Sequence, residues 1–211
     1  MSSSEAAKDC PLCPRLVAFR QENRQKYPDW FNGAVPSFGN NKARLLIVGL
    51  APGLQGANRT GRPFTGDYAG DLLYKALDKF GFSEGSYARH KEDGLRLSDA
   101  IISNALRCVP PANKPLGLEI RTCRQFLQAQ IESLENLQAI LALGRIAHES
   151  ILSCYEAKRK DNLFAHGGRY KLGSINLFSS YHCSRYNTNT GRLTEEMFFN
   201  VFKDIKEFLK L

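Results

Sequence analysis

The stretch of sequence that decides the fold is Leu45-Leu46-Ile47-Val48-Gly49-Leu50. It is apolar throughout instead of alternating between apolar and polar residues, which is typical of a strand covered on both faces in a parallel sheet. Three further apolar runs follow it along the chain, Ile101-Ile102 continuing towards Leu106, Ala139 to Leu143, and Ile175 to Tyr181. The sequence therefore predicts a central sheet of four strands that is mostly parallel.

Helical patterns lie before and between these runs, at about residues 12–25, 71–79, 118–134 and 146–155. The pattern at the C-terminal end is the clearest, because Thr194 suits a helix N-cap and an apolar stripe follows it. The stripe consists of Phe198, Val201, Phe202, Ile205, Phe208 and Leu209. Strands that alternate with helices predict an α/β fold, a three-layer α/β/α sandwich, in which ligands bind beyond the carboxyl ends of the strands.

The composition excludes a disordered or fibrous protein, since 43% of the 211 residues are hydrophobic and 24% are charged. No repeat or linker divides the chain, so we expect a single domain over residues 1–211. A net charge of +8 favours a polyanionic partner. No apolar run is long enough to span a bilayer, and the opening MSSSEAAKDC lacks the apolar stretch of a secretory signal. We therefore expect a cytoplasmic protein without a membrane partner.

Four of the six cysteines form a candidate metal site, because thiols in a reducing compartment serve as ligands, catalytic groups or core residues more often than as disulfides. A C-x-x-C pair near the start is followed much later by two more cysteines. Tetrahedral zinc and an iron-sulfur cluster both accept four thiolates, and spacing does not decide between them. Cys154 and Cys183 are expected to be free thiols. The candidate ligands are Cys10, Cys13, Cys108 and Cys123.

The loop after the first strand, GLAPGLQGANRTGRPFTGD at residues 49–67, is rich in glycine and too long for a simple connection. It lacks the Gly-Lys-Ser/Thr ending of a P-loop and the Rossmann spacing. Its backbone can approach a flat ligand closely, and it carries one aromatic residue, Phe64, and one carboxylate, Asp67. A second unusual segment, SSYHCSRYNTNTGRLT at residues 179–194, follows the fourth strand.

These two segments resemble the two motifs of the uracil-DNA glycosylase superfamily, and specifically of its family 5, the iron-sulfur branch. The four candidate ligand cysteines match that family's arrangement. The resemblance implies a hydrolase of N-glycosyl bonds that removes uracil, and also hypoxanthine, xanthine or other deaminated bases, from DNA and so initiates base excision repair. Neither motif places a lysine for a Schiff base, so we expect a monofunctional enzyme. Action on duplex DNA needs no partner, so we expect a monomer. The resemblance also implies a 4Fe-4S cluster with a structural role.

A glycosylase must extrude its base from the stack and grip it by stacking and by hydrogen bonds to its edge. The resemblance implies that Phe64 is the stacking platform, and that Gly49, Ala51 and Gly53 border the base. By the same resemblance, Asn104 stands where related glycosylases carry an Asn that reads the uracil edge, and an amide suits this because it presents a donor and an acceptor together. An Asn that bonds to loop backbone is the plain alternative. Without the resemblance, Phe64 would be interpreted as a loop residue folded onto the core.

Three residues are the catalytic candidates. Asp67 is suited to orient water or to stabilise the cationic sugar, although a helix cap is an equally common role for such an Asp. His182 is suited to donate a hydrogen bond to the base carbonyl as negative charge develops. Asn113 matches a further active-site position of the family.

The basic and polar residues of the two motifs are the DNA-binding candidates, because they can contact phosphates without regard to sequence. A solvated surface loop is the plain alternative. The candidates are Arg59, Arg185, Asn187, Thr188, Thr190 and Arg192.

Two rival functions follow from other features. His90-Lys91-Glu92 suggests a zinc deaminase, but that signature needs Pro-Cys-x-x-Cys downstream, whereas the C-x-x-C pair here, Cys10-Pro11-Leu12-Cys13, lies upstream. A non-catalytic iron-sulfur or zinc protein that binds DNA lesions is the rival from a different class. It rests on Leu50-Ala51, which stand where other glycosylase families carry an acidic residue.

Overall fold

The central sheet has six strands in the part of the chain that this computed structural model describes, residues 4–210. The order is β1-β5-β2-β6-β8-β7. The four predicted strands form its parallel centre, and two antiparallel strands that the sequence did not predict flank them. The bounds are β1 Phe38–Gly39, β2 Leu45–Gly49, β5 Ala100–Asn104, β6 Ala139–Leu143, β7 Arg169–Leu172 and β8 Ile175–Ser180.

The two edge strands escaped prediction because neither is an apolar run. β1 has only two residues, and only Leu172 of the four β7 residues is buried, so neither strand carries the pattern of a strand buried on both faces. The prediction of four strands is therefore correct for the parallel centre and too low for the whole sheet.

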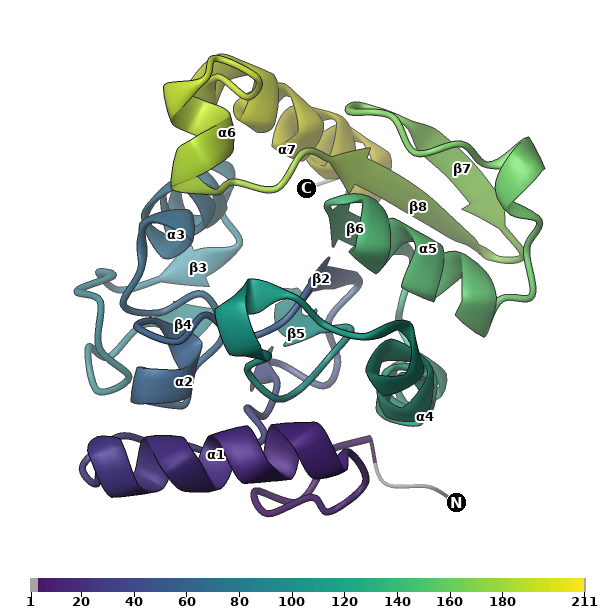
Figure 1. Cartoon of the computed structure of the whole chain (residues 1–211). Helices are drawn as coiled ribbons and strands as arrows, with labels where there is room; N and C mark the ends of the chain where they lie inside the picture. Colours follow the sequence, from purple (N-terminus) through teal and green to yellow (C-terminus); the bar gives the residue numbers. More distant parts are fainter. Residues whose placement is uncertain (1–3, 211) are drawn as a thin grey trace.

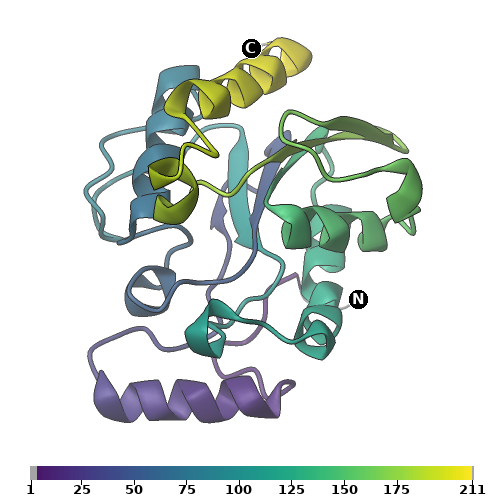
Figure 2. The same cartoon turned by 45° about the horizontal axis from the view of Figure 1, so that its top comes forward.

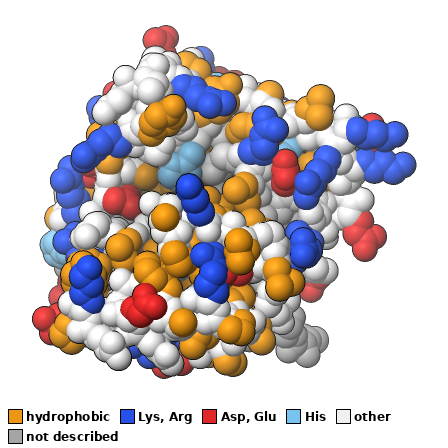
Figure 3. Space-filling view, in the orientation of Figure 1, with side chains coloured by type: hydrophobic (Ala, Val, Ile, Leu, Met, Phe, Trp, Pro, Cys, Tyr) orange, Lys and Arg blue, Asp and Glu red, His pale blue; other side chains and the backbone are white. Residues whose placement is uncertain are grey.

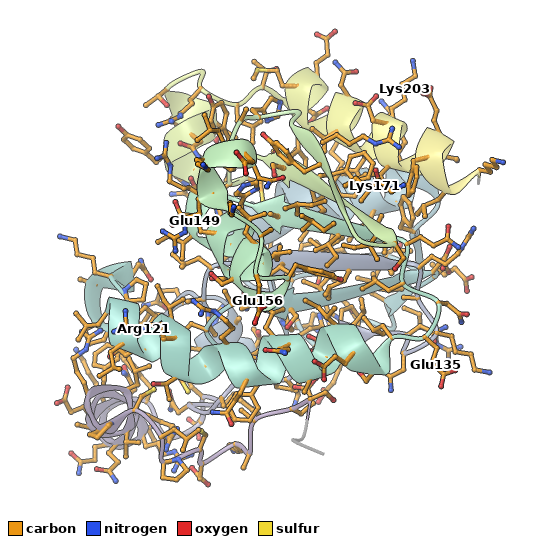
Figure 4. All side chains as sticks on the ribbon, turned by 90° about the vertical axis from the view of Figure 1, so that its right-hand side faces the viewer. Arg121, Glu135, Glu149, Glu156, Lys171 and Lys203 are labelled. Carbon is orange, nitrogen blue, oxygen red and sulfur yellow. The ribbon has the colours of Figure 1, made fainter. Side chains whose placement is uncertain are left out.

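Helices cover both faces of the sheet, as predicted for a three-layer α/β/α sandwich (Figure 1). α3 (Tyr68–Phe80) and α7 (Glu195–Leu209) pack on one face, and α4 (Gly117–Ser133) and α5 (Arg145–Cys154) pack on the other. Figure 4 shows these layers from the side, with α4, which carries Arg121, on one side of the sheet and α7, which carries Lys203, on the other.

Alternate residues of β2 supply the two halves of the core. Leu45 and Ile47 pack with residues of α3 and α7, whereas Leu46 and Val48 pack with residues of α4 and α5. All four side chains are fully buried. A strand with apolar side chains on both faces can hold two helical layers, which is why this segment determines the fold.

The N-terminal helix α1 (Pro14–Lys26) lies outside this sandwich, below it in Figures 1 and 2. Its buried Leu16 packs against Leu106 and Cys123. These two residues come from the segment after β5 and from α4, so α1 joins the body on the side where the candidate ligand cysteines lie.

Short elements complete the chain: α2 Ala57–Thr60, β3 Ser83–Glu84, β4 Arg96–Leu97, α6 Arg185–Asn189, and 3-10 turns at Pro111–Asn113 and Arg159–Asp161. The predicted N-cap Thr194 accepts a hydrogen bond from the backbone N–H of Met197 at 3.1 Å. No helix among residues 4–210 has the length and apolar character to cross a membrane.

Candidate active site

A cavity of about 510 Å³ opens where the carboxyl ends of the parallel strands meet the two motif segments. On the face shown in Figure 3, Lys and Arg side chains are spread around an area in which hydrophobic side chains gather. The structure brings eight of the predicted site residues together in the cavity lining: Ala51, Gly53, Phe64, Asp67, Asn104, Asn113, His182 and Arg185.

The back of the site is built on the pairing of Gly49, at the end of β2, with Asn104, at the end of β5. A Cβ atom on Gly49 would lie 2.5 Å from Oδ1 of Asn104 and 2.6 Å from Cζ of Phe64. Only a residue without a side chain therefore lets the amide and the ring come so close together. Gly49 itself does not line the cavity; it makes room for the two residues that do.

Asn104 is 3% exposed, and its Oδ1 has no hydrogen-bond partner among the described residues. A buried amide without a partner costs free energy, so such groups in folded proteins usually meet water or a ligand. An acceptor and donor pair at the wall of a cavity is what recognition of a base edge requires.

Phe64 is 7% exposed and adopts a φ of +52°, in the left-handed region that bulky residues seldom occupy. Its ring faces the imidazole of His182 with 5.8 Å between the ring centroids and 26° between the planes. Packing onto the core would explain why Phe64 is buried, but it would not explain why Phe64 also lines the cavity.

His182 lies two residues after the end of β8, and its imidazole makes no hydrogen bond within residues 4–210. Burial lowers the pKa of His182 to about 4, because a charged imidazolium is poorly solvated there. The ring is therefore neutral at physiological pH and carries one N–H donor. The side chain of Asn187 donates to the backbone carbonyl of His182 at 2.8 Å and fixes the turn after the strand.

Asp67 combines the two roles that the sequence left open. Its Oδ1 accepts from the backbone N–H of Gly70 at 3.2 Å, so it is the N-cap of α3. Its other oxygen lies beside the loop, where a Cβ on Gly53 or Gly56 would approach it to 2.9 Å or 2.2 Å. Burial raises the pKa of Asp67, with a smaller contribution from the nearby charge of Asp71.

Asn113 borders the mouth of the cavity from the segment after β5, and it is exposed. Two consecutive left-handed residues, Ala112 at φ +54° and Asn113 at φ +55°, turn the chain at this point. Asn113 is thus an exposed residue in the lining of the same cavity as the motif residues.

The predicted DNA-binding residues do not form one group. Arg185 lines the cavity, with its guanidinium carbon 5.4 Å from the ring centre of Tyr68. Asn187 and Arg192 border a neighbouring cavity of about 300 Å³, which shares His182 with the first. Arg59 lies on α2, outside both linings, where it donates to the carbonyl of Gly66 at 3.4 Å.

Thr188, in α6, and Thr190, the residue that follows α6, both donate their hydroxyl groups to backbone carbonyls of that helix. Thr188 donates to the carbonyl of Arg185 at 3.1 Å, and Thr190 donates to the carbonyl of Tyr186 at 2.8 Å. The polar segment that was expected to be a loop is thus the five-residue helix α6, capped by Ser184.

Sequence analysis missed several residues of the site. Gln55, Tyr68, Pro110 and Ser184 line the cavity, and the first two lie in or next to the first motif, where their position gave a usable signal. Tyr186 is 72% exposed on α6, next to the cavity-lining Arg185.

The candidate ligand cysteines line a second cavity between α1, the segment after β5 and α4, together with Leu12, Leu16 and Phe126. The backbone N–H of Arg107 donates to Sγ of Cys123 at 3.3 Å, and the guanidinium of Arg20 lies 3.9 Å from Sγ of Cys108.

Burial raises the pKa of Cys123 to about 11 and that of Cys108 to about 12. The chemical types of the groups present, four thiols with N–H donors and apolar walls around them, suit an iron-sulfur cluster. As the side chains lie, residues 4–210 contain no group of three or more His, Cys, Asp or Glu arranged to hold a metal ion.

Comparisons with known proteins place the chain in a family. The model of the uracil DNA glycosylase superfamily matches residues 36–206. A type-5 uracil-DNA glycosylase from Thermus thermophilus is 44% identical over 209 residues, which cover 96% of this chain and 94% of the relative. A type-5 uracil-DNA glycosylase from Pyrobaculum aerophilum is 36% identical over 92% of this chain and 87% of its own. A type-4 uracil-DNA glycosylase from Saccharolobus solfataricus is 30% identical over 92% of this chain and 85% of the relative. The chain therefore belongs to the uracil DNA glycosylase superfamily and, within it, to the type-5 family.

Proposed function

We propose that this protein is a monofunctional DNA glycosylase that hydrolyses the N-glycosidic bond of uracil in DNA and so initiates base excision repair. Family membership supports this activity. The observation that carries it is the buried amide of Asn104, which opens without a partner into the same cavity as Phe64, His182 and Asp67. Other deaminated bases, such as hypoxanthine and xanthine, are further substrates of the proposal.

The base leaves the duplex and enters the cavity, because its glycosidic carbon is out of reach inside the stack. Phe64 stacks on the flat face of the uracil, and Gly49, Ala51 and Gly53 provide the room for it. The amide of Asn104 pairs with O4 and N3–H of uracil. A base without this pattern leaves a buried amide unpaired, which disfavours its binding.

In the chemical step, the bond between C1′ and N1 breaks, and the electron pair leaves with the uracil. The neutral His182 donates a hydrogen bond to the base carbonyl oxygen, where negative charge develops. The carboxylate of Asp67 stabilises the cationic sugar and orients a water molecule, whose oxygen bonds to C1′. The proton that this water loses balances the negative charge of the departing uracil, so the products are neutral uracil and an abasic sugar with a hydroxyl on C1′. Asn113, at the exposed edge of the cavity, belongs to the proposed catalytic residues because it matches an active-site position of the family. No lysine of either motif is placed to attack the sugar, so the proposed enzyme leaves the strand uncut.

The proposed phosphate contacts come from Arg185, which lines the base cavity, and from residues outside its lining, Arg59, Asn187, Thr188, Thr190 and Arg192. We further propose that Tyr186 enters the stack where the base has left. It is 72% exposed and next to Arg185, and an apolar side chain inserted at a base step supports an extruded base.

The four cysteines would hold a 4Fe-4S cluster, with zinc as the alternative. The thiol donor set and the N–H groups of Arg107 and Arg20 support this assignment. The cluster would connect α1 to the segment after β5 and supply no chemistry to the hydrolysis. We propose that the chain acts as one domain and as a monomer on duplex DNA.

The test uses the purified protein with an end-labelled duplex that contains one G:U pair, in a buffer with EDTA, followed by alkali. Cleavage at the uracil only after alkali is the expected result. Asp67→Asn keeps a capping side chain but removes the charge, and we expect it to lower the excision rate by about 10²–10⁴-fold, as we do for His182→Ala, with duplex binding retained.

A lesion-binding protein without activity is the rival outcome. It would bind the duplex tightly and in a salt-dependent way, yet it would release no uracil, hypoxanthine or xanthine. Cleavage without alkali would overturn the monofunctional assignment.

A further inference from the structure

The conformation of Phe64 needs support from the surrounding structure, because a φ of +52° is unfavourable for a bulky residue. The peptide units around it are held by side-chain groups. Tyr74 donates its hydroxyl to the carbonyl of Pro63 at 2.8 Å, and Arg62 donates its Nε to the hydroxyl of Thr65 at 2.8 Å.

The hydroxyl of Tyr87 acts on both sides of Phe64. It donates to the carbonyl of Phe64 at 3.2 Å and accepts from the backbone N–H of Gly66 at 3.2 Å. Its approach depends on Gly70 in the first turn of α3, where a Cβ atom would lie 2.6 Å from this hydroxyl oxygen and 1.9 Å from the carbonyl oxygen of Phe64. Tyr87 is thus inserted between the motif loop and the helix that Asp67 caps.

Tyr87 is in turn held by a buried ion pair. Arg62 and Asp93 form two hydrogen bonds of 2.7 Å, and the Asp93 side chain is fully buried. The guanidinium of Arg62 lies 5.7 Å from the ring centre of Tyr87, which stacks on Tyr74 at 4.3 Å.

Asp93 also fixes the segment that carries Tyr87. It accepts from the backbone N–H groups of Ala88 at 3.0 Å and Leu95 at 3.1 Å. The carboxylate is therefore satisfied on several sides, which keeps a buried charge tolerable.

We propose that Tyr87 is a positioning residue for base capture, which holds Phe64 in its left-handed conformation and its ring in the base cavity, and that the Arg62–Asp93 pair holds Tyr87. Neither Tyr87 nor Asp93 lines the cavity, so they act only through Phe64. This inference rests on the proposed function, because it assigns Phe64 the role of base platform.

The test compares Tyr87→Phe with the wild-type protein, since this substitution removes only the hydroxyl group. Tyr170→Phe is the matched control, because the hydroxyl of Tyr170 also donates to a backbone carbonyl, that of Leu163, but outside the base cavity. Three quantities are measured: the inhibition constant of free uracil, the dissociation constant for a duplex with an abasic site, and the single-turnover rate on a G:U duplex.

For Tyr87→Phe we expect free uracil to inhibit about tenfold more weakly and the single-turnover rate to fall by a similar factor, with the affinity for the abasic duplex unchanged. Tyr170→Phe should match the wild type in all three. Asp93→Asn serves as a second variant, and it should change the same two quantities in the same direction.

The positioning role would be overturned if Tyr87→Phe kept the wild-type inhibition constant for free uracil and the wild-type single-turnover rate, whether or not its melting temperature fell. The proposed function would then remain intact. An equal loss in all three quantities would also overturn the positioning role, because a general loss of structure predicts that result. If the wild-type protein itself neither releases uracil nor responds to free uracil, the proposed function fails and the positioning role fails with it.

Discussion

Gly49 and Asn104 are register partners across β2 and β5, and a Cβ atom at residue 49 would lie 2.5 Å from the amide oxygen of Asn104. The same Cβ would lie 2.6 Å from the ring of Phe64. The missing side chain at one residue thus sets the distance between the group proposed to read the base edge and the ring proposed to stack on it.

Gly49→Ala should therefore displace both groups. We expect kcat/KM on a G:U duplex to fall by about 100-fold, because shifts of about 1 Å at a reacting site carry that cost, and the free energy of unfolding to fall by about 1–3 kcal/mol. Gly117→Ala is the control, since its Cβ would make ordinary contact with Arg121 at 3.5 Å. Steady-state kinetics at the wild-type level in Gly49→Ala would contradict this account of the pocket.

The lowered pKa of His182 predicts a loss of stability in acid. The ordinary pKa is 6.5 and the folded value is about 4, so between these pH values the unfolded chain binds more protons than the folded one. Stability should fall as the pH falls through this window, by on the order of 2–3 kcal/mol from His182 alone. Urea unfolding at pH 7, 5.5 and 4 should show a smaller loss for His182→Gln than for the wild type, and parallel curves for the two proteins would refute the assignment.

The pH dependence of excision has a different origin. His182 stays neutral above about pH 4, whereas the pKa of Asp67 is raised by burial. Because the proposed mechanism needs the Asp67 carboxylate, the single-turnover rate should fall on the acid side as Asp67 is protonated. In Asp67→Asn the residual rate should lack this limb. If the limb persists in that variant, another group controls it.

The cysteine cavity predicts which thiols would hold the proposed cluster. Cys123→Ser should lose iron, sulfide and the brown colour, and its melting temperature should fall by about 5–10 °C. Cys154→Ser is the matched control, because Cys154 is a free cysteine at the end of α5, outside the cavity. If elemental analysis of the wild-type protein found zinc instead of iron, the four cysteines would be assigned to a zinc site and not to a cluster.

Tyr186→Ala should affect duplex substrates selectively. A side chain that fills the vacated stack matters only where a stack exists, so we expect an excision rate about tenfold lower on a G:U duplex and little changed on single-stranded DNA. Leu163→Ala is the control, because Leu163 is also a large and highly exposed residue, at 69%, and its substitution should change neither rate. Equal losses on both substrates would argue against the wedge.

The sequence predicted the inner strands because their pattern is a direct consequence of burial on both faces, as Leu45 and Leu46 show. It did not predict β7, whose half-exposed side chains pair with β8 without an apolar run. It also missed α6, because Ser184 and the polar residues after it are as typical of a loop as of a short capped helix.

For the site, the sequence placed the cavity residues through the motifs, and the structure brings Phe64, Asp67, Asn104 and His182 into one lining. It gave no signal for Tyr87. The role proposed for this residue depends on a pairing of Arg62 with Asp93 across distant segments, and no local pattern records such a pairing. The DNA-binding role of Arg59 stays a prediction, and in the structure its exposed side chain donates to the carbonyl of Gly66.

The position of α1 has a consequence for the order of events during synthesis. Cys10 and Cys13 leave the ribosome first, but the cavity they line is completed only by Cys108 and Cys123, far downstream. Closing so long a segment of chain has an entropic cost, which a bound cluster would offset. Loading of the proposed cluster must therefore wait until Cys123 in α4 has been made, and until then the surface on which Leu16 of α1 packs is incomplete.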